Sequence, residues 1–185
     1  MTGKTTDRRT LKTQRALRDA LAELLTEKQL HKVTVQEIAD KADVNRVTFY
    51  KHFLDVYDLY DRIETDTLTE LGLLALSLAE LPAEKFFSHL LSTVSENRTI
   101  YRMIFSPNAT GQLRGKLSHM IEGVFLQIGS EKTGRDINDR ELAFISCYRA
   151  QGCLAVISKW VQGGFEEPQE LIARNIAALD SNIAK

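Results

Sequence analysis

The chain has 185 residues, of which 43% are hydrophobic and 26% are charged, and its formal net charge is −1. The length allows one domain, or a small domain followed by a larger one, and the composition is that of an ordinary globular protein. The most apolar run, residues 71–81, is too short to span a bilayer and is interrupted by Ser77 and Glu80, which excludes a membrane-spanning chain.

The charges are distributed unevenly along the chain. Residues 1–53 carry 11 Lys/Arg against 7 Asp/Glu, whereas residues 54–185 carry 13 against 18. A basic segment before an acidic remainder is expected when only one part of a protein touches nucleic acid, although the net charge alone argues against that partner. The N-terminus does not have the pattern of a signal peptide, so we expect a cytoplasmic protein.

The N-terminal residues 1–9 are expected to form a flexible basic arm, followed by a helix over residues 10–27. The basic side chains of this region could lie along a phosphate backbone or simply be solvated; they are Lys4, Arg8, Arg9 and Lys12. The helix has one apolar stripe at helical spacing, formed by Leu17, Ala20, Leu21, Leu24 and Leu25.

Residues 34–53 predict two short helices joined by a tight turn. Thr34 is a favourable N-cap, and Glu37 three residues later completes a capping box. Asn45 can cap a second helix over residues 46–52, which gives a helix-turn-helix whose second helix enters a major groove. Arg46 can fork onto guanine, and its polar neighbours can donate to phosphates or bases. The residues expected to contact DNA are Thr34, Asn45, Arg46, Val47, Thr48, Tyr50, Lys51 and His52.

This stretch resembles the DNA-binding domain of the TetR family of bacterial transcription regulators. The resemblance is carried by Thr34-Val35, Ile38-Ala39, Ala42, Val44 and Thr48-x-Tyr50-x-His52-Phe53. It implies that Thr48 and Tyr50 hold phosphates and that Arg46 reads a base. The family usually has a lysine three residues after the phenylalanine, where this chain has Val56, so Lys51 or the N-terminal arm would have to compensate. The alternative is an ordinary helical hairpin with a solvated polar face.

The remainder of the chain also reads as helical. No stretch alternates with period two, and no hairpin dipeptide joins two apolar runs. We expect nine helices in an all-α, TetR-like fold, with a helix-turn-helix domain over residues 1–54 and a ligand-binding and dimerisation domain over residues 55–185. The helices expected after the turn cover residues 56–79, 84–96, 98–106, 110–130, 138–163 and 168–183.

The last two predicted helices carry more apolar residues than a small domain needs to bury. We therefore expect a second subunit to cover them, although a central core helix in a monomer is an alternative. The family resemblance implies the same, because the last two helices of each TetR subunit form a four-helix interface. The expected interface residues are Leu154, Ile157, Trp160, Val161, Ile172, Ile176 and Leu179.

Aromatic and sulfur-containing residues in the middle of the chain would suit a small ligand between helices, although most of them can equally be core residues. The resemblance, rather than the residues, implies an effector pocket. Its expected lining is Phe86, His89, Tyr101, Phe105, Met120, Phe125, Tyr148 and Gln151. The pattern from Tyr148-x-x-x-Gly152 to Leu171 also resembles a short C-terminal type, some members of which regulate dihydroxyacetone kinase operons and answer to a protein partner.

The sequence offers little support for catalysis or metal binding. It has no nucleophile elbow, no Gly-rich phosphate loop and no HExxH motif, and Cys147 and Cys153 fall on different faces of one predicted helix. We expect no enzyme activity, no cofactor and no metal. The function expected is that of a ligand-responsive dimeric repressor on a palindromic operator; the alternative is a regulator or adaptor that binds a protein partner and can act as an activator.

Overall fold

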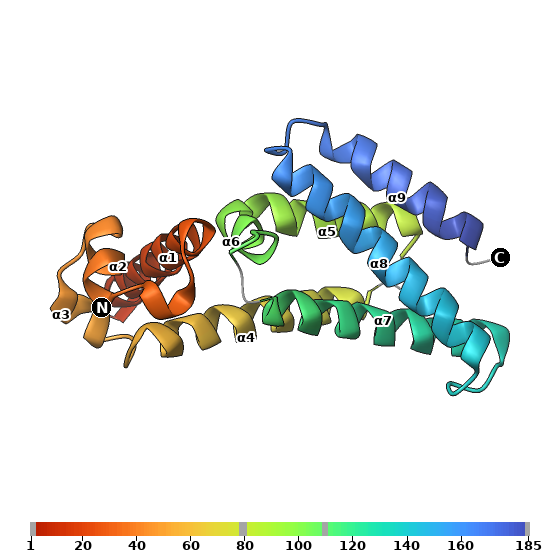
Figure 1. The fold of residues 1–185 in the computed structure, drawn as a ribbon, viewed down its shortest axis with the longest axis horizontal. Helices are drawn as coiled ribbons and strands as arrows, with labels where there is room; N and C mark the ends of the chain where they lie inside the picture. The colour runs from red at the N-terminus through yellow and green to blue at the C-terminus, as the bar shows by residue number, and fades with distance from the viewer. Residues whose placement is uncertain (1–2, 78–80, 109–110, 184–185) are drawn as a thin grey trace. The chain divides into compact units, whose positions relative to one another are not determined.

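The computed structural model describes residues 3–77, 81–108 and 111–183 (Figure 1). Over these residues the chain forms nine α-helices and one short 3₁₀ helix and no β-strand, which confirms the all-α prediction. The α-helices are α1 (Gly3–Glu27), α2 (Val35–Lys41), α3 (Arg46–Tyr50), α4 (Val56–Ala75), α5 (Ala83–Glu96), α6 (Arg98–Ile104), α7 (Gln112–Thr133), α8 (Arg140–Gln162) and α9 (Gln169–Ile183); the 3₁₀ helix covers Leu30–Lys32.

The chain divides into two compact units. Unit 1 contains Met1–Thr67 and Thr99–Gly111, and unit 2 contains Leu68–Arg98 and Gln112–Lys185. The first boundary therefore falls within α4, so that this helix contributes residues to both units. The functional division at residue 54 stays a prediction.

Unit 1 is built around α1, α2, α3 and the first turns of α4. Its apolar stripes meet in a core of fully buried side chains, which includes Leu17, Leu21, Ile38, Phe49, Leu59 and Ile63. The segment after α6 closes the end of α1, because Asn108 donates from Nδ2 to the carbonyl oxygen of Thr26 at 2.7 Å. Carbonyls in the last turn of a helix lack partners within the helix, so this bond satisfies one of them.

Ion pairs at the rim of unit 1 join its helices. Lys41 of α2 pairs with Glu23 of α1 at 3.0 Å, and Arg18 of α1 pairs with Asp66 of α4 at 3.2 Å. All four side chains are partly exposed, so each pair is worth at most about 1 kcal/mol. The buried apolar residues therefore supply most of the stability, while the pairs favour one packing of the helices.

Two expected boundaries differ from the structure by four residues or more, and the others by three or fewer. The flexible arm over residues 1–9 is not present in the described part of the chain, because α1 already begins at Gly3. No proline interrupts residues 3–9, so a helix that has nucleated can propagate through them. Helix α4 ends at Ala75 rather than at residue 79, because Ser77 donates from both its backbone N–H and its hydroxyl to the carbonyl of Leu74. Residues 78 and 79 lie outside the described residues.

Unit 2 packs α5 against α9, and α7 and α9 against α8 (Figure 1). The turn after α8 is organised by Trp160, whose Nε1 donates to the carbonyl oxygen of Glu167 at 2.9 Å. Phe165 has a φ of +63° and places its ring edge-on to Trp160, with centroids 5.0 Å apart. These contacts of Trp160 stabilise the turn that returns the chain from α8 to α9.

Candidate nucleic-acid interface and effector cavities

The start of α2 is fixed by the predicted capping box. The backbone N–H of Glu37 donates to Thr34 Oγ1 at 3.3 Å, and that of Thr34 donates to Glu37 Oε2 at 2.9 Å. Glu37 also pairs with Lys28. The hydrogen bond from Lys28, followed by that from the Thr34 backbone, lowers the pKa of Glu37 to about 2. The Thr34 side chain is thus occupied in holding the helix, although it remains exposed.

The turn between α2 and α3 sets the direction of α3. Asp43 adopts a φ of +52°, in the left-handed region that Asp and Asn tolerate better than other non-glycine residues. The N–H of Val44 returns to the carbonyl of Ala39 at 3.0 Å. Asn45 then caps α3, since its side-chain oxygen accepts from the N–H of Val47 at 2.8 Å. Its role as a cap is local and was readable from the sequence.

Helix α3 has one buried and one exposed face. Phe49 is fully buried and contacts Phe53, with ring centroids 5.8 Å apart. Val47 and Tyr50 are 65% and 49% exposed. Arg46 and Lys51 are exposed as well, whereas Thr48 and His52 are half-buried. The structure therefore brings seven of the eight predicted contact residues together on and beside one short helix, while Thr34 lies at the start of α2.

Arg46 and Tyr50 contact each other on the exposed face. Arg46 donates from Nη2 to the Tyr50 hydroxyl at 3.0 Å, and its guanidinium carbon lies 5.4 Å from the centroid of the ring. The Tyr50 ring stands at 84° to that of Phe49, with centroids 5.6 Å apart. An exposed arginine is thus connected to the core through one aromatic ring.

Unit 2 contains a small, wholly apolar cavity of about 40 Å³. Water occupies about 10–15 Å³ on this measure, so the cavity has room for about three water molecules. A ligand of metabolite size needs it to widen. Residues of four helices line it, among them Leu71, Leu74, Phe86, Phe87, Met120, Phe125 and Ile157.

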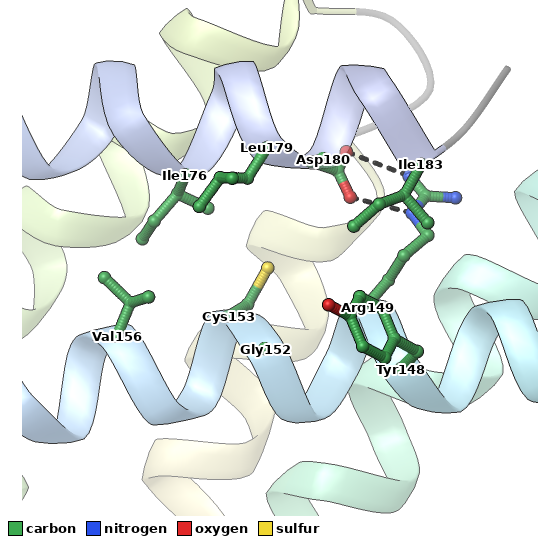
Figure 2. A pocket seen from close by; sticks show the side chains of 9 residues that line it. All are labelled: Tyr148, Arg149, Gly152, Cys153, Val156, Ile176, Leu179, Asp180 and Ile183. Atoms are coloured by element: carbon green, nitrogen blue, oxygen red, sulfur yellow. Dashed lines mark hydrogen bonds and ion pairs between the residues drawn. The ribbon is translucent and has the colours of Figure 1, made fainter.

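A second cavity of about 120 Å³ lies between α8 and α9 (Figure 2). One end of it carries a bidentate ion pair, in which Arg149 donates to Asp180 from Nε at 2.7 Å and from Nη2 at 2.9 Å. The guanidinium carbon also lies 4.1 Å from the ring centroid of Phe125. Cys153 lines both cavities. Burial, with the nearby Asp180 carboxylate, raises the pKa of its thiol to about 12, so this cysteine is a poor nucleophile.

Comparison with known proteins gives the family. Residues 17–63 match the model described as bacterial regulatory proteins of the tetR family, and residues 83–181 match the model described as transcriptional regulator C-terminal region. The chain belongs to the TetR family of transcription regulators. The resemblance of residues 34–53 is therefore confirmed, and the protein is a DNA-binding regulator rather than an enzyme. No curated protein gave a significant match.

Solved structures of regulators share this TetR fold. The dihydroxyacetone kinase operon activator DhaS has a TM-score of 0.62 at 21% identity, over 92% of this chain and 94% of its own. A TetR transcriptional regulator from Streptococcus agalactiae 2603V has a TM-score of 0.61 at 18% identity, over 97% of this chain and 99% of its own. The fatty acid degradation regulator FadR from Bacillus halodurans has a TM-score of 0.62 at 14% identity, over 90% of this chain and 93% of its own.

The predicted effector residues of this TetR regulator are not brought together. Phe86, Met120 and Phe125 line the apolar cavity, and Tyr148 lines the α8–α9 cavity. The other predicted lining residues lie elsewhere: His89 and Gln151 are exposed, and Tyr101 and Phe105 are buried in unit 1. Helical periodicity indicated that Tyr101 and Phe105 are buried, but it cannot say which compact unit buries them.

Most of the predicted interface residues lie in the interior of unit 2. Leu154, Ile157, Trp160, Val161 and Ile176 are buried within a single chain, so they have little surface left to offer a second subunit. Ile172 is half-buried, and Leu179 is 57% exposed. The exposed apolar side chains of α8 and α9 that sequence reasoning missed are Phe144, Tyr148 and Leu171. On a helix that is apolar nearly all round, the pattern alone did not separate the inner face from the outer one.

Tyr57 is a further polar candidate that the sequence analysis passed over. Val56, which stands where the family usually has lysine, is buried in the core and cannot reach a phosphate. Its neighbour Tyr57 is 53% exposed and carries a hydroxyl donor. The absence of the family's usual lysine at position 56 could have drawn attention to Tyr57, the next residue in the chain.

The described residues contain no group of three His, Cys, Asp or Glu side chains that could hold a metal ion. None of the helices formed by these residues is both long enough and apolar enough to cross a bilayer.

Proposed function

We propose that this TetR regulator is a homodimeric repressor that binds a palindromic DNA operator through α3 and releases it when an effector binds in unit 2. The observation that supports DNA recognition by α3 is its division into two faces. Phe49 fixes one face in the core, while Arg46, Val47, Tyr50 and Lys51 stand exposed on the other. Arg46 would read a base, Val47 would contact a thymine methyl group, and the polar residues would bind phosphates.

A direct test compares two variants that each lose two positive charges. Arg46→Ala/Lys51→Ala removes charge from α3, and Lys132→Ala/Arg174→Ala removes it from exposed positions of unit 2. Binding to a duplex of random sequence is measured over a range of salt concentrations. Each lost phosphate contact should lower the salt slope by about 0.9, so the α3 variant should bind more weakly with a smaller slope. Equal binding by the two variants would contradict the assignment of α3.

Dimerisation is supported by the exposed apolar residues of the last two helices. Phe144, Tyr148 and Leu179 are 77%, 66% and 57% exposed. Exposed large apolar side chains are commonly covered by a partner when they are contiguous. A second copy of the chain is the occupant we propose, because a palindromic operator needs two reading helices related by two-fold symmetry.

The effector is proposed to enter the apolar cavity of unit 2. Leu71 and Leu74, which line it, belong to α4, and the same helix contributes Leu59 and Ile63 to the core of unit 1. Widening the cavity would therefore displace a helix whose first turns belong to the same core as Phe49 of α3. A coupling of 1–3 kcal/mol would release DNA by about 5–150-fold. An apolar effector fits this lining, in keeping with the fatty acid degradation named for the regulator from Bacillus halodurans.

A regulator that answers to a protein partner and can act as an activator is the second candidate. The small volume of the cavity, about 40 Å³, favours a protein partner over a metabolite, and the similar DhaS is itself named an activator, of the dihydroxyacetone kinase operon. Leu74→Trp, which fills the cavity, separates the two candidates. It should change DNA affinity if the cavity controls α4, and a metabolite panel should then stabilise the parent but not the variant. Unchanged affinity and no stabilising metabolite would favour the protein partner.

A further inference from the structure

The contact between Arg46 and Tyr50 suggests a role for the tyrosine beyond holding a phosphate. The two residues are four apart on α3, which places them on one face of the helix. The Tyr50 ring is held edge-on by the buried Phe49, and the guanidinium of Arg46 lies against that ring and donates to its hydroxyl. A flexible arginine side chain is thereby held in one direction before DNA arrives.

The chemistry of the phenol permits two bonds at once. Its oxygen accepts from Arg46, and its own proton is left to donate to an acceptor such as a phosphate oxygen. Accepting a bond from a cation polarises the hydroxyl and strengthens it as a donor. The guanidinium has five N–H donors and uses one of them here, so it can still fork onto the O6 and N7 atoms of a guanine.

We propose that Tyr50 is a specificity-determining residue that positions Arg46 for base reading while its hydroxyl donates to a phosphate. The bond from Tyr50 to a phosphate would fix the position of α3 along the DNA backbone. Through its contact with Arg46, the same residue would also fix the direction of the side chain that reads the base. Ordering Arg46 in advance also reduces the rotamer freedom that binding would otherwise remove. This inference rests on the proposed base-reading role of Arg46.

A Tyr50 that positions Arg46 gives a different mutational result from a Tyr50 that only contacts a phosphate. Loss of a phosphate contact weakens binding to all sequences alike. Tyr50→Phe keeps the ring on Phe49 but removes the hydroxyl, so Arg46 loses its acceptor. The ratio of specific to random-sequence affinity should therefore fall by roughly 3–10-fold, the size of one hydrogen bond. Lys51→Met, which removes an exposed cation without a contact to Arg46, should leave that ratio unchanged.

The test uses the duplex that the wild-type chain selects from a random pool, the same duplex with each G·C pair replaced in turn, and an unselected duplex. Affinities are measured for wild type, Tyr50→Phe, Arg46→Ala, the double variant and Lys51→Met, with folding checked by thermal unfolding. In the Arg46→Ala background, Tyr50→Phe should weaken all duplexes equally, because nothing remains for it to position. The two effects should therefore be non-additive on the selected duplex.

Three outcomes would overturn the proposal. If Arg46→Ala lowers the specificity ratio and Tyr50→Phe does not, the positioning role is wrong and the base-reading role stands. If Lys51→Met lowers the ratio as much as Tyr50→Phe, the loss reflects general weakening rather than positioning. If Arg46→Ala leaves the ratio unchanged, both the base-reading role and the positioning role are wrong.

Discussion

The side chains of Arg149 and Asp180 form a bidentate pair inside unit 2, with 10% and 7% of their side-chain surfaces exposed (Figure 2). Burying an ion pair requires the desolvation of both ions, which offsets much of their attraction. The fold is therefore destabilised most when one ion is removed and the other stays buried alone. The pair joins α8 to α9 next to the wall formed by Phe125. The pair therefore helps to hold together the two helices that we propose to form the dimer.

Removal of one partner of this pair should be far more damaging than replacement of both. Arg149→Met leaves Asp180 buried without its cation and should lower the free energy of unfolding by about 3–5 kcal/mol. Arg149→Met/Asp180→Leu should recover most of that loss, because no charge remains buried. Urea unfolding monitored by circular dichroism measures both. A single variant as stable as the wild type would show that the pair is solvated in solution.

At the scale of an element, α2 depends on the ionised form of Glu37. The pKa of Glu37 is lowered from 4.5 to about 2 by Lys28 and by the Thr34 backbone. A carboxyl with a lowered pKa stabilises the fold while it is ionised, and protonation removes this contribution as the pH falls. The window runs from about pH 4.5 down to about pH 2.

Glu37→Gln should thus be less stable than the wild type at pH 7 and should approach it as the pH falls through this window. Gln keeps the acceptor for the capping box but not the charge that attracts Lys28. Thermal unfolding of both proteins at a series of pH values measures the difference. A constant difference in stability from pH 7 to pH 2 would contradict the assigned pKa.

Elements with local determinants were the predictable part of the fold. The capping box of Thr34 and Glu37 and the Asn45 cap of α3 form as expected, because each involves residues at most three apart in the sequence. The end of α4 was not predictable to the residue, since the Ser77 hydroxyl competes for the carbonyl of Leu74 at a site where apolar periodicity continues. Apolar periodicity identifies a helix more securely than it identifies where the helix ends.

At the level of the whole molecule, the sequence could not show which distant element covers a buried side chain. Leu154, Ile157 and Trp160 of α8 are buried as the apolar pattern indicated, but they are covered by their own chain. Tyr101 and Phe105 were assigned to the effector site although they belong to unit 1. In both cases the pattern reports that a side chain is buried and does not report which element buries it.

The proposed dimer surface, which contains Phe144, Tyr148 and Leu179, predicts that substitutions of exposed and of buried residues have different effects. Tyr148→Glu/Leu179→Glu places charges on the exposed face and should give folded monomers, whereas Trp160→Glu places a charge in the core and should unfold the chain. Leu73→Glu on α4 is a control for an added surface charge, since Leu73 is 65% exposed and belongs to neither α8 nor α9. Sedimentation velocity and circular dichroism separate these outcomes. A dimeric Tyr148→Glu/Leu179→Glu variant would place the interface elsewhere.

Selection of bound duplexes from a random pool, followed by sequencing, tests whether two copies of α3 read a palindromic operator. Two copies of α3 should select an inverted repeat whose half-sites have centres about 10 base pairs, or a multiple of one turn, apart. Arg46→Ala should select the same spacing with weaker preference for one base pair in each half-site. A pool that yields no enriched sequence, or single half-sites without a repeat, would contradict recognition of a palindromic operator by two copies of α3.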